Sequence, residues 1–168
     1  MKKFLNILVF VGLTGSLFAQ NDIDPSYKKM IERKYDGLPT IEPDSAAQKI
    51  GDPSVYFFDT REDEEYNVSR IPKAIQLGYD NVKWSIIDTL DKNSEIIIYC
   101  SIGVRSQDIG IKLTEKGFKN VNNLYGGIFL WADQNRILHD SYENEVNVVH
   151  GYNKYWGRWI KNAKTVYE

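Results

Sequence analysis

Cys100, the single cysteine of this 168-residue chain, stands in the stretch YCSIGVRSQ, whose residue types could carry chemistry. An apolar run precedes the cysteine, and a short polar stretch containing Gly103 and Arg105 follows it. A glycine-containing loop ahead of a helix can turn its backbone N–H groups inward and bind an anion, helped by the helix dipole. Such a loop stabilises a thiolate, the nucleophilic form of cysteine. We therefore predict a nucleophilic Cys100; the alternative is a buried, inert cysteine that packs as a small apolar residue.

The elements that would position Cys100 alternate between strands and helices. Runs rich in apolar residues and bounded by turn residues predict strands at 55–58, 74–77, 96–99 and 121–124. Helices are expected at 25–31, 45–50, 59–66, 82–90, 106–116 and 128–133. This alternation is typical of an α/β domain with a mostly parallel sheet. Cys100 would then follow the carboxyl end of a strand, which is the edge where such sheets bind ligands.

Three motifs, in this order along the chain, resemble those of the rhodanese sulfurtransferases. The loop resembles the active-site loop of that family and comprises Cys100, Ser101, Ile102, Gly103, Val104, Arg105 and Ser106. Upstream, DTREDEEY at 59–66 is similar to the family signature Asp-x-Arg-x-x-x-Glu-Tyr. Downstream, Gly117-Phe118, Gly126-Gly127 and Trp131 are similar to the closing pattern of the family. The resemblance implies a rhodanese-like α/β fold, a mostly parallel sheet flanked by helices on both faces, over residues 40–137.

The resemblance also implies a sulfurtransferase that works in two steps through Cys100. The thiolate would take a sulfane sulfur from a small anionic donor such as thiosulfate, and a thiol or cyanide-like acceptor would then remove it. Amides of the loop 101–106 would stabilise the thiolate and the persulfide, and Arg105 would attract the donor. Ser106 would cap the following helix and donate a hydrogen bond to the sulfur. Asp59 and Arg61 would support the loop from below.

Neither a cofactor nor a metal is expected, since two histidines and one cysteine do not form a ligand cluster. Two other functions remain open. A Cys-dependent phosphatase or arsenate reductase also uses a Cys…Arg loop, but its loop is one residue longer than the four residues between Cys100 and Arg105. A rhodanese-like module without catalytic activity would only bind a partner; such modules often lack the cysteine that this chain retains.

The sequence departs from the family pattern at Arg70 and Lys73, where the family usually has histidine and glycine. These two residues add positive charge next to the first signature. Either both side chains face solvent, or they help to attract an anionic donor.

The N-terminal residues 1–19 have the layout of a secretory signal peptide: Lys2 and Lys3, an apolar stretch, and Ala19 before the expected cleavage site. The apolar stretch is shorter than the roughly 20 residues of a membrane span. We therefore expect an exported protein, periplasmic in a Gram-negative bacterium and otherwise secreted, with no stable membrane insertion after cleavage. The formal net charge of −2 gives no electrostatic footprint for nucleic acid.

The two ends of the exported chain lie outside the rhodanese-like region. Residues 20–39 are expected to form a helical lead-in, and residues 138–168 a C-terminal extension. Within that extension Tyr152, Tyr155, Trp156 and Trp159 recur at helical spacing, which predicts an ordered aromatic helix. This helix either packs on the outer helices of the sheet or borders the Cys100 pocket and limits which acceptor can approach.

Overall fold

The computed structural model describes residues 23–167. The predicted signal peptide at residues 1–19 lies outside the described residues. None of the helices within residues 23–167 is both long enough and apolar enough to cross a membrane.

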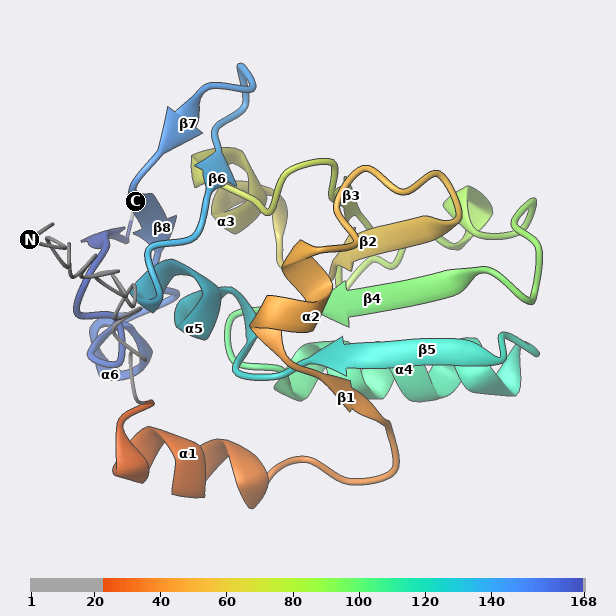
Figure 1. Cartoon of the computed structure of the whole chain (residues 1–168), viewed down its shortest axis with the longest axis horizontal. Helices are drawn as coiled ribbons and strands as arrows, with labels where there is room; N and C mark the ends of the chain where they lie inside the picture. The colour runs from red at the N-terminus through yellow and green to blue at the C-terminus, as the bar shows by residue number, and fades with distance from the viewer. Residues whose placement is uncertain (1–22, 168) are drawn as a thin grey trace, which may run out of the picture.

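A five-stranded parallel sheet forms the centre of the molecule, with the strand order β1-β5-β4-β2-β3 (Figure 1). Its strands are β1 (Thr40–Ile41), β2 (Val55–Asp59), β3 (Ile75–Gln76), β4 (Glu95–Tyr99) and β5 (Asn120–Leu124). The α-helices before and between these strands are α1 (Pro25–Glu32), α2 (Pro43–Ala47), α3 (Asp63–Val68) and α4 (Val104–Glu115), and a 3₁₀-helix spans Trp84–Ile86. Thus β4, which leads to Cys100, is the central strand.

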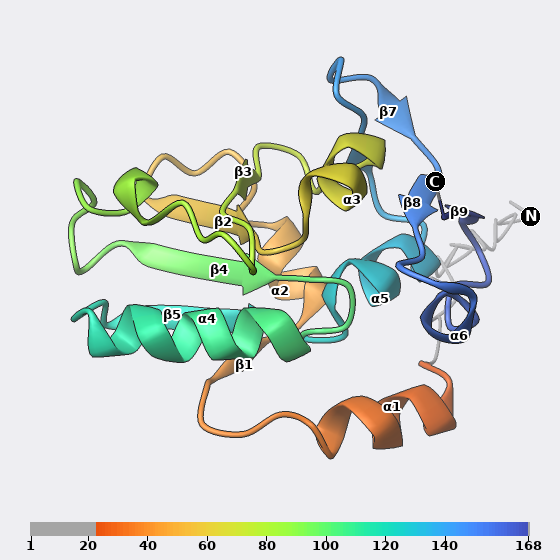
Figure 2. The same cartoon turned by 180° about the vertical axis from the view of Figure 1, so that it is seen from behind.

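Alternating side chains of β4 enter two separate apolar cores, one on each face of the sheet. Ile96 and Ile98 pack in the core that α4 covers, whereas Ile97 packs in the core on the opposite face, together with α2 and α5 (Gly127–Asp133). Figures 1 and 2, seen from opposite sides, show α2 in front of the sheet and α4 behind it, and then the reverse. The predicted α/β fold, with a mostly parallel sheet flanked by helices, is confirmed.

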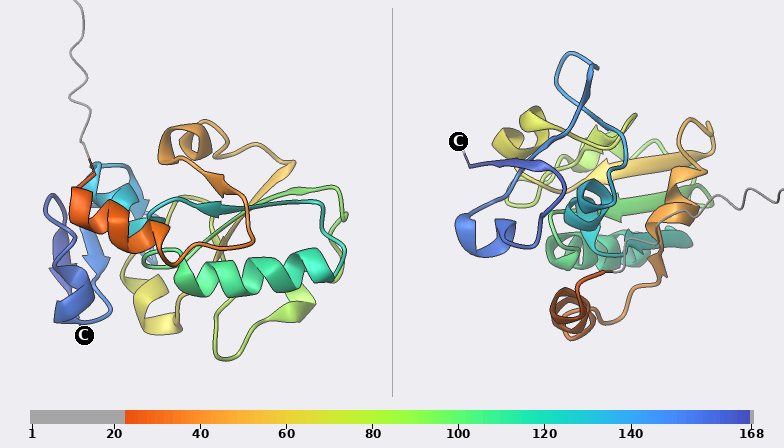
Figure 3. Two further views of the ribbon diagram at one scale, coloured as in Figure 1. Left: turned by 90° about the horizontal axis from the view of Figure 1, so that it is seen from below. Right: turned by 60° about the vertical axis from the view of Figure 1, so that its left-hand side comes forward.

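The C-terminal extension lies beyond the carboxyl ends of the central strands, beside α1 and α5 (Figure 3). Its elements are β6 (Leu138–His139), β7 (Glu145–Val146), β8 (Val148–His150), α6 (Lys154–Gly157) and β9 (Lys164–Val166). Strands β6 and β7 pair antiparallel, and β8 and β9 pair parallel. The extension is ordered and aromatic, as expected, but its helix α6 has only four residues. The helical periodicity of its aromatic residues therefore predicted too long a helix, because Tyr152 has a left-handed φ of 61° ahead of the N-cap Asn153 and the helix ends at Gly157, before Trp159.

The segment 82–90 was predicted as a helix and instead contains only the short 3₁₀-helix Trp84–Ile86. Val82, Ile86 and Leu90, whose spacing predicted the helix, are partly buried against the core on the α4 face, but the fully buried residue is Ile87, outside that pattern. The run Ile86-Ile87-Asp88-Thr89 consists of residues with poor helix propensity, which explains why a full helix does not form.

Candidate active site

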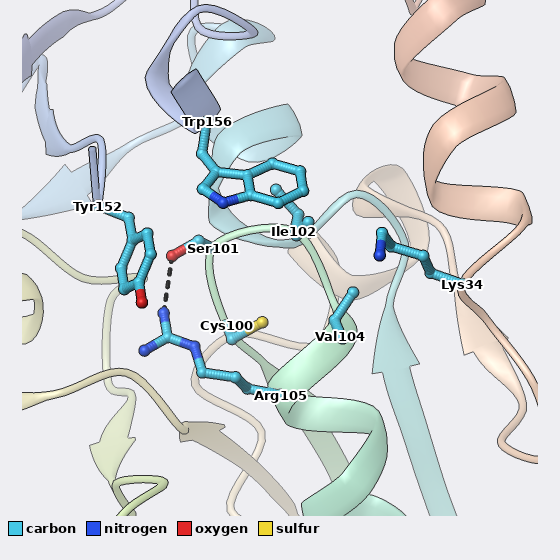
Figure 4. A pocket seen from close by; sticks show the side chains of 8 residues that line it. All are labelled: Lys34, Cys100, Ser101, Ile102, Val104, Arg105, Tyr152 and Trp156. Carbon is cyan, nitrogen blue, oxygen red and sulfur yellow. Dashed lines mark hydrogen bonds between the residues drawn. The ribbon is translucent and has the colours of Figure 1, made fainter. Parts of the chain in front are cut away.

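Cys100 directly follows β4, and its side chain is only 1% exposed, at the base of an open pocket (Figure 4). Its Sγ accepts a hydrogen bond from the backbone N–H of Gly103, at 3.1 Å. Helix α4 begins at the next residue, Val104, so the positive end of its dipole faces the loop that holds the sulfur. A backbone donor and a helix N-terminus therefore both act on one thiol.

Gly103 takes its position because only a residue without a side chain fits there. Its φ of 91° is left-handed, and a Cβ at this position would lie 2.0 Å from the hydroxyl of Tyr35. That hydroxyl donates to the carbonyl of Ile102 at 2.8 Å and accepts from the N–H of Gly126 at 3.0 Å. Tyr35, from the lead-in, thus fixes the middle of the Cys100 loop.

The start of α5 holds the other side of the loop. The N–H groups of Ile128 and Phe129 donate to the carbonyls of Cys100 and Ser101, at 2.9 and 3.1 Å. This close approach requires Gly127, whose φ is 58° and whose Cβ, if present, would lie 2.5 Å from the Cys100 carbonyl oxygen. The carbonyls of Cys100 and Ser101 are therefore bound on this side of the loop, while the Gly103 N–H faces the sulfur.

Arg105 lies beside the pocket, but its charge is already paired. Its two terminal nitrogens donate to the Glu65 carboxylate, both at 2.8 Å, and one of them also donates to Ser101 Oγ at 3.0 Å. Ser101 Oγ donates in turn to Glu65 at 2.8 Å. The guanidinium also lies over the Tyr152 ring, 5.2 Å from its centroid. Arg105 therefore mainly holds the loop in place. The sequence suggested that its charge attracts the donor, but little of that charge remains unpaired.

Glu65, only 3% exposed, is a residue of the site to which the sequence analysis gave no role. Burial would raise the pKa of its carboxyl group, but hydrogen bonds and the charge of Arg105, with help from Arg61 and Ser101, hold the pKa below its ordinary value. Glu65 is the glutamate of the first signature, so the sequence contained a sign of its importance. The sequence alone could not show that its partner is Arg105.

Asp59 is the last residue of β2 and Arg61 follows it closely, and neither lines the pocket. Both side chains are fully buried, and Arg61 donates to the Asp59 carboxylate through Nε and Nη2 and to the Ser69 carbonyl at 2.6 Å. Thr60, between these two residues in the sequence, donates its N–H to the carbonyl of Tyr99, at the end of β4. This contact joins the segment of the pair to the end of the strand that leads to Cys100, and the supporting role of Asp59 and Arg61 stays a prediction.

Ser106 does not occupy the place that the sequence analysis gave it. The N-cap of α4 is Gly103, and Ser106 Oγ donates to the side chain of Asn123 on β5, at 2.8 Å. Asn123 also donates to the Gly103 carbonyl, at 2.8 Å. Ser106 therefore fixes the loop to the neighbouring strand, because α4 begins two residues earlier than predicted and turns this side chain toward the sheet.

The pocket above Cys100 is a cavity of about 170 Å³ with mostly apolar walls. From the loop it is lined by Cys100, Ser101, Ile102, Val104 and Arg105, and from elsewhere by Lys34, Tyr152 and Trp156. Figure 4 shows Trp156 and Tyr152 over the loop and Lys34 on the opposite side from Arg105. Of the two roles considered for the aromatic extension, bordering the Cys100 pocket therefore fits the geometry of Tyr152 and Trp156.

Arg70 and Lys73 lie away from this pocket. The expectation that both face solvent is wrong for Arg70, which is 8% exposed, forms an ion pair with Glu143 and lies over the Tyr66 ring. Lys73 is exposed and adopts a left-handed φ of 65°, so the turn keeps the conformation that glycine would favour. Neither side chain is placed to meet a donor at Cys100. Within residues 23–167, no cluster of three or more His, Cys, Asp or Glu side chains could hold a metal ion.

The sequence model of the rhodanese-like domain family matches residues 42–134, so the chain belongs to this family. A Bacillus subtilis (strain 168) protein named "Putative sulfurtransferase YtwF" is 35% identical over 85 residues, which cover 51% of this chain and 81% of that protein. The tRNA uridine(34) hydroxylase of Yersinia pestis (strain Pestoides F) is 33% identical over 97 residues, 55% of this chain but only 27% of that enzyme.

Solved structures agree on the fold. The BH2092 protein of Bacillus halodurans matches with a TM-score of 0.56 at 22% identity, covering 69% of this chain and 85% of that one. The rhodanese-like domain of the Anabaena protein Alr3790 matches with a TM-score of 0.56 at 20% identity, covering 64% and 83%. At such identities the likeness shows the fold alone.

Proposed function

We propose that this protein is a sulfurtransferase that moves a sulfane sulfur from thiosulfate or a similar anionic donor to a thiophilic acceptor. The observation that carries the proposal is the Cys100 Sγ, which accepts from the Gly103 N–H at 3.1 Å at the base of a pocket open to solvent. The family and the name of the Bacillus subtilis relative support sulfur transfer in general. Thiosulfate as the donor is our proposal.

In the first step the Cys100 thiolate attacks the outer sulfur of thiosulfate. The S–S bond of the donor breaks, sulfite leaves with the electron pair, and Cys100 becomes a persulfide. The Gly103 N–H and the N-terminus of α4 stabilise the negative sulfur before and after transfer. In the second step an acceptor thiolate or cyanide attacks the outer sulfur of the persulfide, and Cys100 leaves as the thiolate.

The test is intact-mass spectrometry after incubation with thiosulfate. We expect the wild-type protein to gain about 32 Da, one sulfur atom, and to lose it when cyanide is added. A Cys100→Ser variant, nearly the same in shape, should keep the fold and gain nothing. A wild type without the gain, or a Ser variant with it, would contradict the mechanism.

Two features of the site argue against the other candidate functions. A phosphatase needs an arginine free to hold the phosphate oxygens, whereas both terminal nitrogens of Arg105 are bound to Glu65. A module that only binds a partner would have no need for an N–H group directed at a thiol. Failure of the mass test would leave the binding module as the better proposal.

We further propose that the protein is exported, periplasmic or secreted according to its source, and acts on small molecules and not on nucleic acid. The signal-like residues 1–19 support export. Expression with this segment, cell fractionation and N-terminal sequencing would test it: a mature chain beginning at Gln20 is expected. Full-length protein retained in the cytoplasm would contradict the proposal.

A further inference from the structure

Three residues that line the Cys100 cavity lie outside the family match at residues 42–134. Lys34 comes from the segment after α1, and Tyr152 and Trp156 come from the C-terminal extension. These side chains, from the lead-in and from the extension, complete a pocket whose floor is the family loop (Figure 4). Whatever selectivity they confer therefore belongs to this chain and not to the family as a whole.

The cavity is larger and more apolar than a small anionic donor needs. Its volume of about 170 Å³ is close to the roughly 150 Å³ of an apolar protein cavity known to bind benzene. Ile102, Val104, Tyr152 and Trp156 provide apolar and aromatic surface above the sulfur. Such walls favour the binding of an apolar group the size of one aromatic ring and contribute little to the binding of sulfite or thiosulfate.

The charge that remains unpaired in the pocket lies on one side, at Lys34. The Arg105 guanidinium is paired with Glu65 and lies against the Tyr152 ring, so little of its charge remains for a substrate. Lys34 is exposed, its side chain extends toward the cavity, and within residues 23–167 it has no ion-pair partner. An anionic group on a bound molecule would therefore be placed next to Lys34.

We propose that the physiological acceptor is an organic thiol with an apolar body about the size of one ring and a single anionic group. The body would lie against Trp156 and Tyr152, and the anionic group beside Lys34. This inference rests on the proposed function, because the acceptor acts on the Cys100 persulfide. Its thiolate attacks the outer sulfur, a new S–S bond forms, the Sγ–S bond breaks with its electrons staying on Sγ, and an organic persulfide departs.

The experiment loads Cys100 with thiosulfate, removes excess donor and measures the loss of about 32 Da after mixing with three acceptors. The acceptors are 4-mercaptobenzoate, 4-mercaptobenzamide, which keeps the ring but not the charge, and 3-mercaptopropionate, which keeps the charge but not the ring. Thiols differ in their own nucleophilicity, so each rate is compared as variant over wild type, in which that difference cancels.

Trp156→Leu should slow transfer to both ring acceptors about tenfold and transfer to 3-mercaptopropionate much less. Lys34→Gln should slow both carboxylates about threefold and leave the benzamide unchanged. Tyr152→Asn, which removes the other ring and tolerates the left-handed φ of 61°, should repeat the Trp156→Leu pattern even if that variant folds poorly.

Matched controls are Tyr142→Ala, an aromatic residue of the same extension that is 85% exposed, and Lys29→Gln, an exposed lysine of α1. Both should transfer sulfur to all three acceptors at the wild-type rate. Equal slowing of all acceptors, or none, in Trp156→Leu, Tyr152→Asn and Lys34→Gln would overturn the inference while leaving sulfur transfer in place. A wild type that takes up no sulfur would instead contradict the proposed function, and the inference with it.

Discussion

At the scale of single residues, Glu65 links the first signature to the catalytic loop. Its carboxylate binds Arg105 through two nitrogens and Ser101 through its hydroxyl, while its own helix begins just before it with a capping box to Glu62. One acid therefore fixes both the start of α3 and the outer side of the Cys100 loop. Removing its charge should therefore destabilise both the start of α3 and the Cys100 loop.

We predict that Glu65→Gln lowers the free energy of unfolding by roughly 3 kcal/mol at pH 7, because it leaves a largely buried guanidinium only partly paired. Persulfide formation should also slow, since Ser101 and Arg105 lose their common anchor. Chemical denaturation measures the first effect and intact-mass kinetics the second. Lys83→Gln, which disrupts an exposed ion pair with Asp63, is the control and should change stability by less than about 1 kcal/mol. An equal, small change in both variants would contradict this role.

The lowered pKa of Glu65 also predicts how this effect depends on pH. A carboxyl group whose pKa is lower in the folded state stabilises the fold above its unfolded pKa, near 4.5, and loses that contribution as pH falls through the folded value. The difference in unfolding free energy between wild type and Glu65→Gln should therefore be full at pH 7 and shrink below about pH 4.5. A difference that stayed constant from pH 7 to pH 3 would contradict it.

The sequence could predict the loop around Cys100, but neither how its side chains pair nor which residues outside the family region reach the pocket. Residue type and order pointed to Cys100 and to its loop at the end of β4. The partners of Arg105 and Ser106 were assigned wrongly because each contact crosses a large sequence separation, to Glu65 and to Asn123. No motif in the sequence marked Lys34 as a pocket residue, since its place at the pocket depends on how the lead-in packs against the domain.

At the scale of elements, the start of α5 determines the shape of the catalytic loop. Gly126 and Gly127 both have positive φ, at 71° and 58°, which brings the first N–H groups of the helix against the carbonyls of Cys100 and Ser101. The sequence placed the ends of α5, β2, β4 and β5 within one residue of those observed. It could not show that the two glycines serve the loop of a different strand.

We predict that Gly127→Ala displaces the Cys100 loop, because the new Cβ would lie 2.5 and 2.7 Å from the carbonyl oxygens of Cys100 and Ser101. Persulfide formation should be nearly lost, and the melting temperature should fall. Gly117→Ala is a matched control: its φ of 94° imposes similar backbone strain, about 1–2 kcal/mol, but nothing lies within 4 Å of its Cβ. Gly117→Ala should therefore lose some stability and keep its rate. Equal rates in the two variants would show that the close approach is not needed.

At the scale of the whole molecule, α1 of the lead-in and the C-terminal extension pack against each other. Trp159 of the extension stacks on Tyr27 of α1 with ring centroids 5.3 Å apart, and Lys161 forms an ion pair with Asp24 at 2.7 Å. The Tyr27 hydroxyl donates to the carbonyl of Gly126, at 2.7 Å, immediately before α5. The lead-in and the extension therefore support the same end of the sheet at which Cys100 lies, as well as supplying Lys34, Tyr152 and Trp156 to the pocket.

We predict that truncation after Val149 lowers the melting temperature by about 10 °C, because it removes β9, the Trp159 stack and the buried Ile160, together contributing several kcal/mol. Below its melting point the truncated protein should still form the persulfide, since the Gly103 N–H and the start of α5 remain. Its preference for ring-bearing acceptors should fall, because Tyr152 and Trp156 are gone. Calorimetry and the acceptor series measure the two effects, and Trp159→Ala separates them: it should lose stability while retaining the preference. A truncated protein that melts with the wild type and treats the acceptors alike would show that the extension neither supports the fold nor forms part of the pocket.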